Sequence, residues 1–244
     1  MMHLIKSLFY GLPIVIALSL ELAIAPTVAA GIQQAGRKQS NPPPPPSNPG
    51  SSAAGGRRNP QSCPEDTSTA ATAPVLTALR PTREPGLTVA ERPTFLVYVP
   101  RTSAENAEFS LRSQEGRGVY RTTVALTHTP GLISITLPDQ VAPLEVDQPY
   151  VWSFAIICNS NDRLEDRFVT STIQRIELNP TRLQQIEQAS PRQRITLYQD
   201  DNIWYDPLAL LFELRRTQPN DLSLNAAWRE FLQLNGIDVV IINN

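Results

Sequence analysis

The stretch Tyr150-Val151-Trp152-Ser153-Phe154-Ala155-Ile156-Ile157-Cys158 decides the fold of this chain. Every second residue is large and apolar, and in an extended chain these residues share one face: Tyr150, Trp152, Phe154, Ile156 and Cys158. A period of two, enriched in aromatic and β-branched residues, is typical of a strand with one deeply buried face. We therefore predict that this strand lies at the centre of a β-structure and that the rest of the chain surrounds it.

Residues 74–178 hold further short strand-like runs on both sides of this stretch. Turn residues separate the runs, and Glu115-Gly116-Arg117-Gly118 is a hairpin signal. The runs are residues 75–79, 94–99, 107–113, 119–127, 132–137, 150–158 and 168–178. About seven short strands with frequent turns predict an immunoglobulin-like antiparallel β-sandwich. In such a sandwich Tyr150 opens the penultimate strand, where a tyrosine hydroxyl typically bonds to nearby backbone.

The apolar pattern changes to a helical period in residues 179–244. Asn179-Pro180, Ser190-Pro191 and Asp206-Pro207 each place a capping residue before a proline, which is a helix start signal. Asn220-Asp221 opens a fourth helix, and Asn235-Gly236 ends it. Four short helices with short links predict a C-terminal subdomain of two helical hairpins, and strands followed by helices predict an α+β chain. This subdomain either offers a docking surface to a partner or caps an open edge of the sandwich, and the sequence favours neither.

Residues 1–30 have the three parts of an export signal. A weakly basic start is followed by the apolar run 8–20 and by the small residues Val28-Ala29-Ala30. The run is short for a membrane-spanning helix, which needs about twenty apolar residues. We predict cleavage after Ala30, no membrane span in the mature protein, and a periplasmic or extracellular location.

Residues 31–73 are rich in Pro, Ser and Gly, and include the run Pro42–Pro46. A segment with so few large apolar side chains buries too little surface to offset its loss of conformational entropy. We predict a disordered linker that acts as a spacer.

Two cysteines remain in the chain, Cys63 and Cys158. An even pair in an exported protein predicts one disulfide, which would fasten the end of the linker to the central strand. A catalytic thiol or a metal pair is the alternative, but neither cysteine has a cluster of histidines near it in the sequence.

The formal net charge is −2, and the positive charges show no clustering of the kind that duplex DNA requires. Nucleic acid is therefore excluded as a partner. The partner that remains is an envelope protein or a glycan that the sequence does not identify.

The densest acidic cluster consists of Asp200, Asp201 and Asp206, beside Trp204 and Tyr205. Carboxylates next to aromatic side chains would suit a glycosidase or a calcium site. Their positions at helix ends favour capping instead. The polar loop of residues 159–166 offers a weaker calcium candidate, and a solvated hairpin loop is the simpler interpretation. No nucleophile or metalloprotease motif is present, so we predict no catalytic residue, no cofactor and no metal site.

Several short motifs, in a specific order, resemble a family of exported cyanobacterial proteins, the domain of unknown function 928. They are Leu76–Leu79, Arg92–Phe95, Tyr98–Pro100, Ala107–Phe109, Pro130–Ile133, Tyr150-x-Trp152-x-Phe154 through Cys158, and Trp204–Asp206. The resemblance covers residues 63–244 and implies a Gram-negative type of envelope, hence the periplasm. It brings no known activity and no catalytic residues. Pro207 departs from the expected pattern and suggests that its helix begins a turn later in this chain.

Together these features predict an exported, non-enzymatic binding or scaffolding module of the cell envelope. The alternative is a carbohydrate-active hydrolase that uses Asp200, Asp201 and Asp206, which requires the three carboxylates to converge in one cleft. A purely structural envelope protein, without a discrete ligand, is the third hypothesis.

Overall fold

The computed structural model describes Cys63, Asp66 and residues 74–238 of this α+β chain. The predicted export signal and most of the predicted linker lie outside these residues. The described strands are β1 (Thr77–Ala78), β2 (Gly86–Thr88), β3 (Thr94–Val99), β4 (Asn106–Ser113), β5 (Gly118–Ala125), β6 (Gly131–Thr136), β7 (Pro149–Ile156) and β8 (Arg167–Arg175). The helices are the 3-10 turn η1 (Arg163–Glu165), α1 (Pro180–Gln188), α2 (Pro191–Asp200), α3 (Tyr205–Thr217) and α4 (Leu222–Leu234).

The strands form two sheets. One has the order β1-β3-β6, and the other has the order β2-β8-β7-β4-β5, with β7 at its centre as the sequence predicts. Neighbouring strands are antiparallel except β2, which runs parallel to β8. The expectation of a purely antiparallel structure is therefore wrong at this one edge, and β2 itself was not predicted, because three residues beginning with Gly86 show no strand periodicity.

Aromatic side chains from both sheets meet in the core, so the sheets pack face to face as a β-sandwich. The ring of Phe95 on β3 lies 5.0 Å from that of Phe109 on β4 and 5.3 Å from that of Trp152 on β7. All three side chains are fully buried. At the start of β7 the Tyr150 hydroxyl accepts a hydrogen bond from the Glu145 backbone N–H (3.1 Å), which confirms the structural role predicted for this tyrosine.

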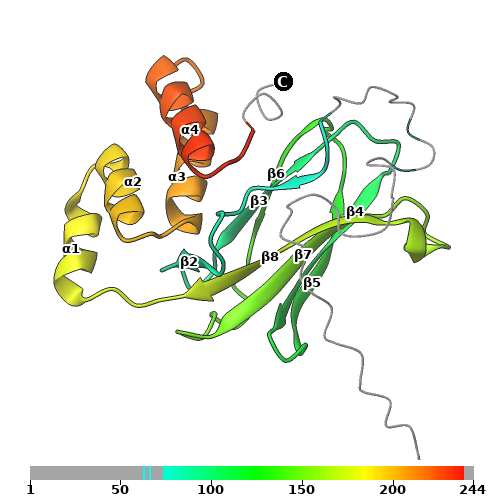
Figure 1. The fold of residues 1–244 in the computed structure, drawn as a ribbon, viewed down its shortest axis with the longest axis horizontal. Helices are drawn as coiled ribbons and strands as arrows, with labels where there is room; N and C mark the ends of the chain where they lie inside the picture. The colour runs from blue at the N-terminus through cyan, green and yellow to red at the C-terminus, as the bar shows by residue number, and fades with distance from the viewer. Residues whose placement is uncertain (1–62, 64–65, 67–73, 239–244) are drawn as a thin grey trace, which may run out of the picture. The chain divides into compact units, whose positions relative to one another are not determined.

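The four α-helices gather on the β2 side of the sheets (Figure 1). Asn179 and Ser190 cap α1 and α2 with their side chains, each followed by a proline, and Asp221 caps α4, all as predicted. The prediction for α3 is wrong in two respects. The helix begins at Tyr205, before Pro207 rather than after it, and Asp206 does not act as its N-cap.

The short link between α2 and α3 covers the outer edge of β2. Ile203 pairs with Leu87 in a parallel bridge, and the Trp204 backbone N–H donates to the Leu87 carbonyl (3.0 Å). An edge strand with unpaired backbone groups invites association with other chains, and this link removes that opportunity at β2. Of the two roles left open for the helical part, capping a sheet edge is thus observed.

A disulfide joins Cys63 to Cys158, as predicted, and its two cysteines are separated by 95 residues in the sequence. Cys158 follows the C-terminal end of β7. Asp66 strengthens this attachment, because its carboxylate accepts hydrogen bonds from the backbone N–H groups of Cys63 (2.7 Å) and Ser103 (2.6 Å). The end of the predicted linker is therefore fixed to the sandwich. Within the described part of the chain, no helix has the length and apolar character that a membrane crossing requires.

Candidate functional site

The segment Trp204-Tyr205-Asp206 opens α3 and fastens the helices to the sandwich. Trp204 donates from its indole Nε1 to the Leu79 carbonyl (3.2 Å) and stacks on Phe231 of α4, with 4.7 Å between the ring centroids. Trp204 therefore joins the segment before β2 to the last helix, and its side chain is buried.

Tyr205 enters the core between the two sheets. Its hydroxyl accepts a hydrogen bond from the Trp152 indole Nε1 (2.8 Å) and lies 3.3 Å from the Thr172 carbonyl, to which it donates. Its ring meets Phe95 edge to face at 5.7 Å. Burial raises the pKa of the Tyr205 phenol well above its ordinary value, so the hydroxyl stays protonated and keeps its donor role.

Asp206 turns toward the segment that follows β2. The Val89 backbone N–H donates to its Oδ2 atom (3.1 Å), and the hydroxyl of Thr88 also bonds to the carboxyl group. Burial raises the pKa of Asp206 above its ordinary value, and these hydrogen bonds oppose the rise. A residue expected to cap its own helix therefore binds backbone 117 positions earlier in the chain.

The other two carboxylates of the acidic cluster have a different partner. Asp201 Oδ2 lies 2.6 Å from Arg182 Nε, and Asp200 Oδ2 lies 3.7 Å from Arg182 Nη2. They join the end of α2 to α1, whereas Asp206 joins α3 to β2. The three carboxylates are thus committed to two separate structural tasks, and the convergence that the hydrolase alternative requires is not observed.

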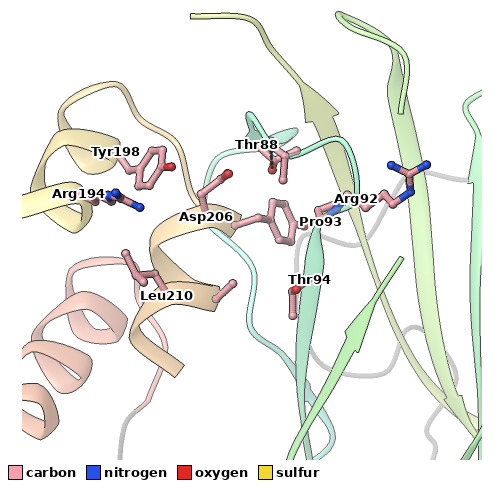
Figure 2. A pocket seen from close by; sticks show the side chains of 11 residues that line it. Thr88, Arg92, Pro93, Thr94, Arg194, Tyr198, Asp206 and Leu210 are labelled. Carbon is pink, nitrogen blue, oxygen red and sulfur yellow. Dashed lines mark hydrogen bonds between the residues drawn. The ribbon is translucent and has the colours of Figure 1, made fainter. Parts of the chain in front are cut away.

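A cavity of about 210 Å³ lies between α2, α3 and the segment from β2 to β3 (Figure 2). The residues that line it are Thr88, Ala90, Arg92, Pro93, Thr94, Arg194, Tyr198, Tyr205, Asp206, Ala209 and Leu210. In Figure 2 the side chains of Tyr198, Arg194 and Asp206 lie close together, and Arg92 extends away from them. Elements distant in sequence therefore form a recess with one polar wall and an apolar wall.

Tyr198 and Arg194 both come from α2. The Tyr198 hydroxyl makes no hydrogen bond to any residue that the structure describes, and burial, together with the charge of Asp206, raises its pKa. Arg194 donates from Nε to the Ala189 carbonyl (3.0 Å) and from Nη2 to the Glu187 carbonyl (2.6 Å), at the C-terminal end of α1. The helix end thus holds the guanidinium in place and leaves Nη1 without a described partner.

Of the residues that line this cavity, the sequence-based candidate site included Asp206 and the neighbouring Tyr205, but it missed Tyr198 and Arg194. Tyr198 and Arg194 precede Asp206 by eight and twelve positions and belong to a different helix, so nothing in the local pattern links them to it. Their position on one face of a helix, four residues apart, is the one signal that was available.

The acidic loop of residues 159–166 has local partners. Asp162 accepts from the Leu164 N–H (3.0 Å) and caps η1, and Asp166 pairs with Arg163 (2.6 Å). No group of three or more His, Cys, Asp and Glu suited to a metal ion occurs in the described residues. Asp162 and Asp166 of this loop are thus engaged in local contacts.

Replacement of Asp206 with asparagine is expected to change how stability depends on pH. Because burial raises the pKa of Asp206 in the folded state, the folded protein takes up this proton at a higher pH than the unfolded chain does. The wild type should therefore gain stability relative to Asp206→Asn as the pH falls from this raised pKa to the ordinary value of an aspartate. Urea unfolding of both proteins across that range measures the difference, with Asp200→Asn as the control. A difference that stays constant with pH would contradict the expectation.

Comparisons with known proteins give a match to one family over most of the chain and weak matches to solved structures. A solved structure of CopC from Methylosinus trichosporium OB3b is 14% identical and covers 38% of this chain and 87% of its own, with a TM-score of 0.26. An fn3 domain of the human collagen alpha-1(XX) chain is also 14% identical. The match covers 40% of this chain and 91% of the fn3 domain, with a TM-score of 0.25. No curated protein matches the chain significantly. The sequence profile of the Domain of Unknown Function DUF928 matches residues 53–243.

Proposed function

Because the chain belongs to the DUF928 family, whose definition names no activity, we propose its function from the cavity between the helices and the sandwich. The protein is an exported, non-enzymatic binding module of the cell envelope. An immunoglobulin-like sandwich carries the site, and the ligand is a single sugar ring or an equally small group bearing several hydroxyls.

The convergence of Tyr198, Arg194 and Asp206 on one small recess carries this proposal. The three side chains supply one free hydroxyl, one free N–H of a guanidinium, and one carboxylate that accepts hydrogen bonds. An anion would be repelled by Asp206 and a cation by Arg194. A neutral group whose hydroxyls both donate and accept fits all three side chains.

The size of the cavity agrees with one ring. An apolar cavity of about 150 Å³ holds benzene, and this cavity is about 210 Å³. Pro93 and Leu210 line it and offer apolar surface to the C–H groups of such a ring. A few fixed polar groups beside an apolar wall are the usual composition of a small-molecule site.

Three features support the absence of turnover and the location outside the cytoplasm. Asp206, held in one orientation by the Val89 N–H and Thr88, is the one carboxylate among the residues that line the cavity, whereas glycoside hydrolysis ordinarily uses a pair. The disulfide between Cys63 and Cys158 is typical of oxidising compartments, and residues 1–30 have the pattern of an export signal. Both features support a periplasmic or extracellular location.

A titration of the mature protein with a panel of monosaccharides and short oligosaccharides, followed by NMR amide shifts, tests this function. We expect saturable shifts at α2 and α3, with dissociation constants near the millimolar range, about −4 kcal/mol, for single sugars. Tyr198→Phe removes one hydrogen bond of about 0.5–1.5 kcal/mol and should weaken binding roughly two- to tenfold. Tyr120→Phe on β5 makes the same chemical change away from the cavity and is the matched control.

Either of two results would overturn the proposal. One is the absence of saturable shifts at α2 and α3 with every member of the panel. The other is the appearance of cleaved products when the oligosaccharides are incubated with the protein, since this would assign turnover rather than binding.

A further inference from the structure

The strand β5 forms the second edge of the five-stranded sheet, opposite β2. It pairs with β4 and with no other described strand, and the helices lie on the far side of the sheet (Figure 1). The link that covers β2 has no counterpart in the described residues at β5. Eight residues of extended backbone, without a proline, therefore form an uncovered edge.

The ladder between β4 and β5 fixes which backbone groups of β5 remain unpaired. The Leu126 N–H donates to the Glu105 carbonyl (2.8 Å), and the residues of an antiparallel strand face their partner alternately. Counting back along β5, Arg121, Thr123 and Ala125 present their N–H and carbonyl groups away from β4. These groups have no backbone partner among the described residues.

The inward side of β5 is also incompletely covered. Tyr120, Thr122 and Val124 point toward the core but are only partly buried, and so are Leu132 and Ile133 on β6. The opposing sheet has three strands, whereas the sheet that contains β5 has five, so the smaller sheet covers the side chains at this edge less completely. One more strand beside β5 would bury these side chains and satisfy the free backbone groups.

We propose that the strand added here is β5 of a second copy of this chain, joined antiparallel about a two-fold axis. Two-fold interfaces use the same patch twice, so the patch must complement itself. We place Thr123 opposite Thr123 of the second copy, a register that pairs the outward-facing residues with one another and keeps the two Arg121 side chains apart. This register places Arg121 opposite Ala125, Tyr120 opposite Leu126, and Thr122 opposite Val124.

The register brings together side chains that suit one another. Tyr120 and Leu126 form an aromatic–aliphatic pair on the inner face, where cross-strand pairs stabilise a sheet. The only charge on β5, Arg121, meets a small residue rather than a second arginine. Its ion pair with Glu108 of the same chain (2.7 Å) already compensates it. No like charges oppose each other at the junction, and two five-stranded sheets become one continuous sheet.

Sedimentation velocity of the mature protein at micromolar to submillimolar concentration tests this assembly. The wild type should sediment as a dimer, with twice the monomer mass. Thr123→Pro removes the central free N–H, which points away from β4, so the internal ladder is kept and the dimer should dissociate. Thr123→Val keeps the N–H and should remain dimeric. Circular dichroism checks that both variants are folded.

A second variant tests the register independently of proline. Residues that face each other in a hydrogen-bonded antiparallel pair have Cα atoms about 5.5 Å apart, within the range of a disulfide. Thr123→Cys should therefore form a covalent dimer under mild oxidation, whereas Ser134→Cys on β6 should not. A monomeric wild type at all concentrations, or a dimer in which Thr123→Cys does not cross-link, would overturn the proposal.

Discussion

Replacement of Tyr205 with alanine is expected to lower the free energy of unfolding by about 3–5 kcal/mol, as for other large aromatic side chains removed from a core. Tyr205 is fully buried, contacts Phe95, and accepts the hydrogen bond of the Trp152 indole. The substitution leaves a cavity between the sheets, deprives Trp152 of its acceptor, and removes the contact that holds α3 to the sandwich. Equilibrium unfolding in urea measures the loss.

Tyr205→Phe is the matched control, since it keeps the ring and removes only the hydroxyl. We expect a loss of about 1–3 kcal/mol, the cost of leaving a buried donor without an acceptor. The two losses separate the packing of the ring from the hydrogen bond of the hydroxyl. If Tyr205→Ala unfolds within about 0.5 kcal/mol of the wild type, as ordinary surface variants do, the junction does not depend on this residue.

Removal of the disulfide by the double substitution Cys63→Ala and Cys158→Ala is expected to cost about 4–5 kcal/mol, because the bond closes a long loop. The separation of 95 residues is large, and so the unfolded chain gains much conformational freedom when the bond is absent. For a domain of this size such a loss corresponds to a fall of roughly 10–20 °C in the melting temperature.

Thermal unfolding of the double variant, and of the wild type with and without a reductant, measures this contribution. The reduced wild type and the double variant should melt at nearly the same temperature. If the double variant instead melts with the oxidised wild type, the contacts of Asp66 with Ser103 hold the segment in place without the covalent bond.

The parts of the fold that the sequence predicted are those in which local pattern and final structure agree. The alternation in β7 survives because its large side chains face the opposing sheet, and Asn179 and Ser190 cap the helices that directly follow them. β2 could not be predicted, because its three residues become a strand only through pairing with β8, almost ninety positions later. The stability of β2 depends on this tertiary pairing, and the residues near β2 in the sequence give no sign of it.

The candidate site was the part least accessible to sequence reasoning. The pattern around Asp206-Pro207 resembles a helix start, and so the aspartate was assigned to its own helix. In the folded protein the carboxylate bonds to Val89 instead, and Trp204 takes the N-cap position without a side-chain hydrogen bond. Partners more than a hundred residues apart leave no periodic trace. Tyr198 and Arg194 lie only eight and twelve positions before Asp206, but they belong to a separate helix, so no shared period links them to it.

The position of the disulfide has a mechanical consequence for the binding module that we propose. Cys158 lies two positions after the end of β7. Thr88, which lines the cavity, pairs with Arg175 at the end of β8, and this end of β8 pairs with the start of β7. The attachment and the cavity thus lie at opposite ends of a strand roughly 25 Å long, at about 3.3 Å per residue. A force applied from the N-terminal side is transmitted through the disulfide to β7 and acts along this strand. The hydrogen bonds of β7 to β8 and β4 are then loaded in shear. The force bypasses residues 64–157, the loop that the disulfide closes, so tension on the linker cannot unfold that loop. The cavity at the opposite end of β7 therefore stays accessible while the protein is under tension.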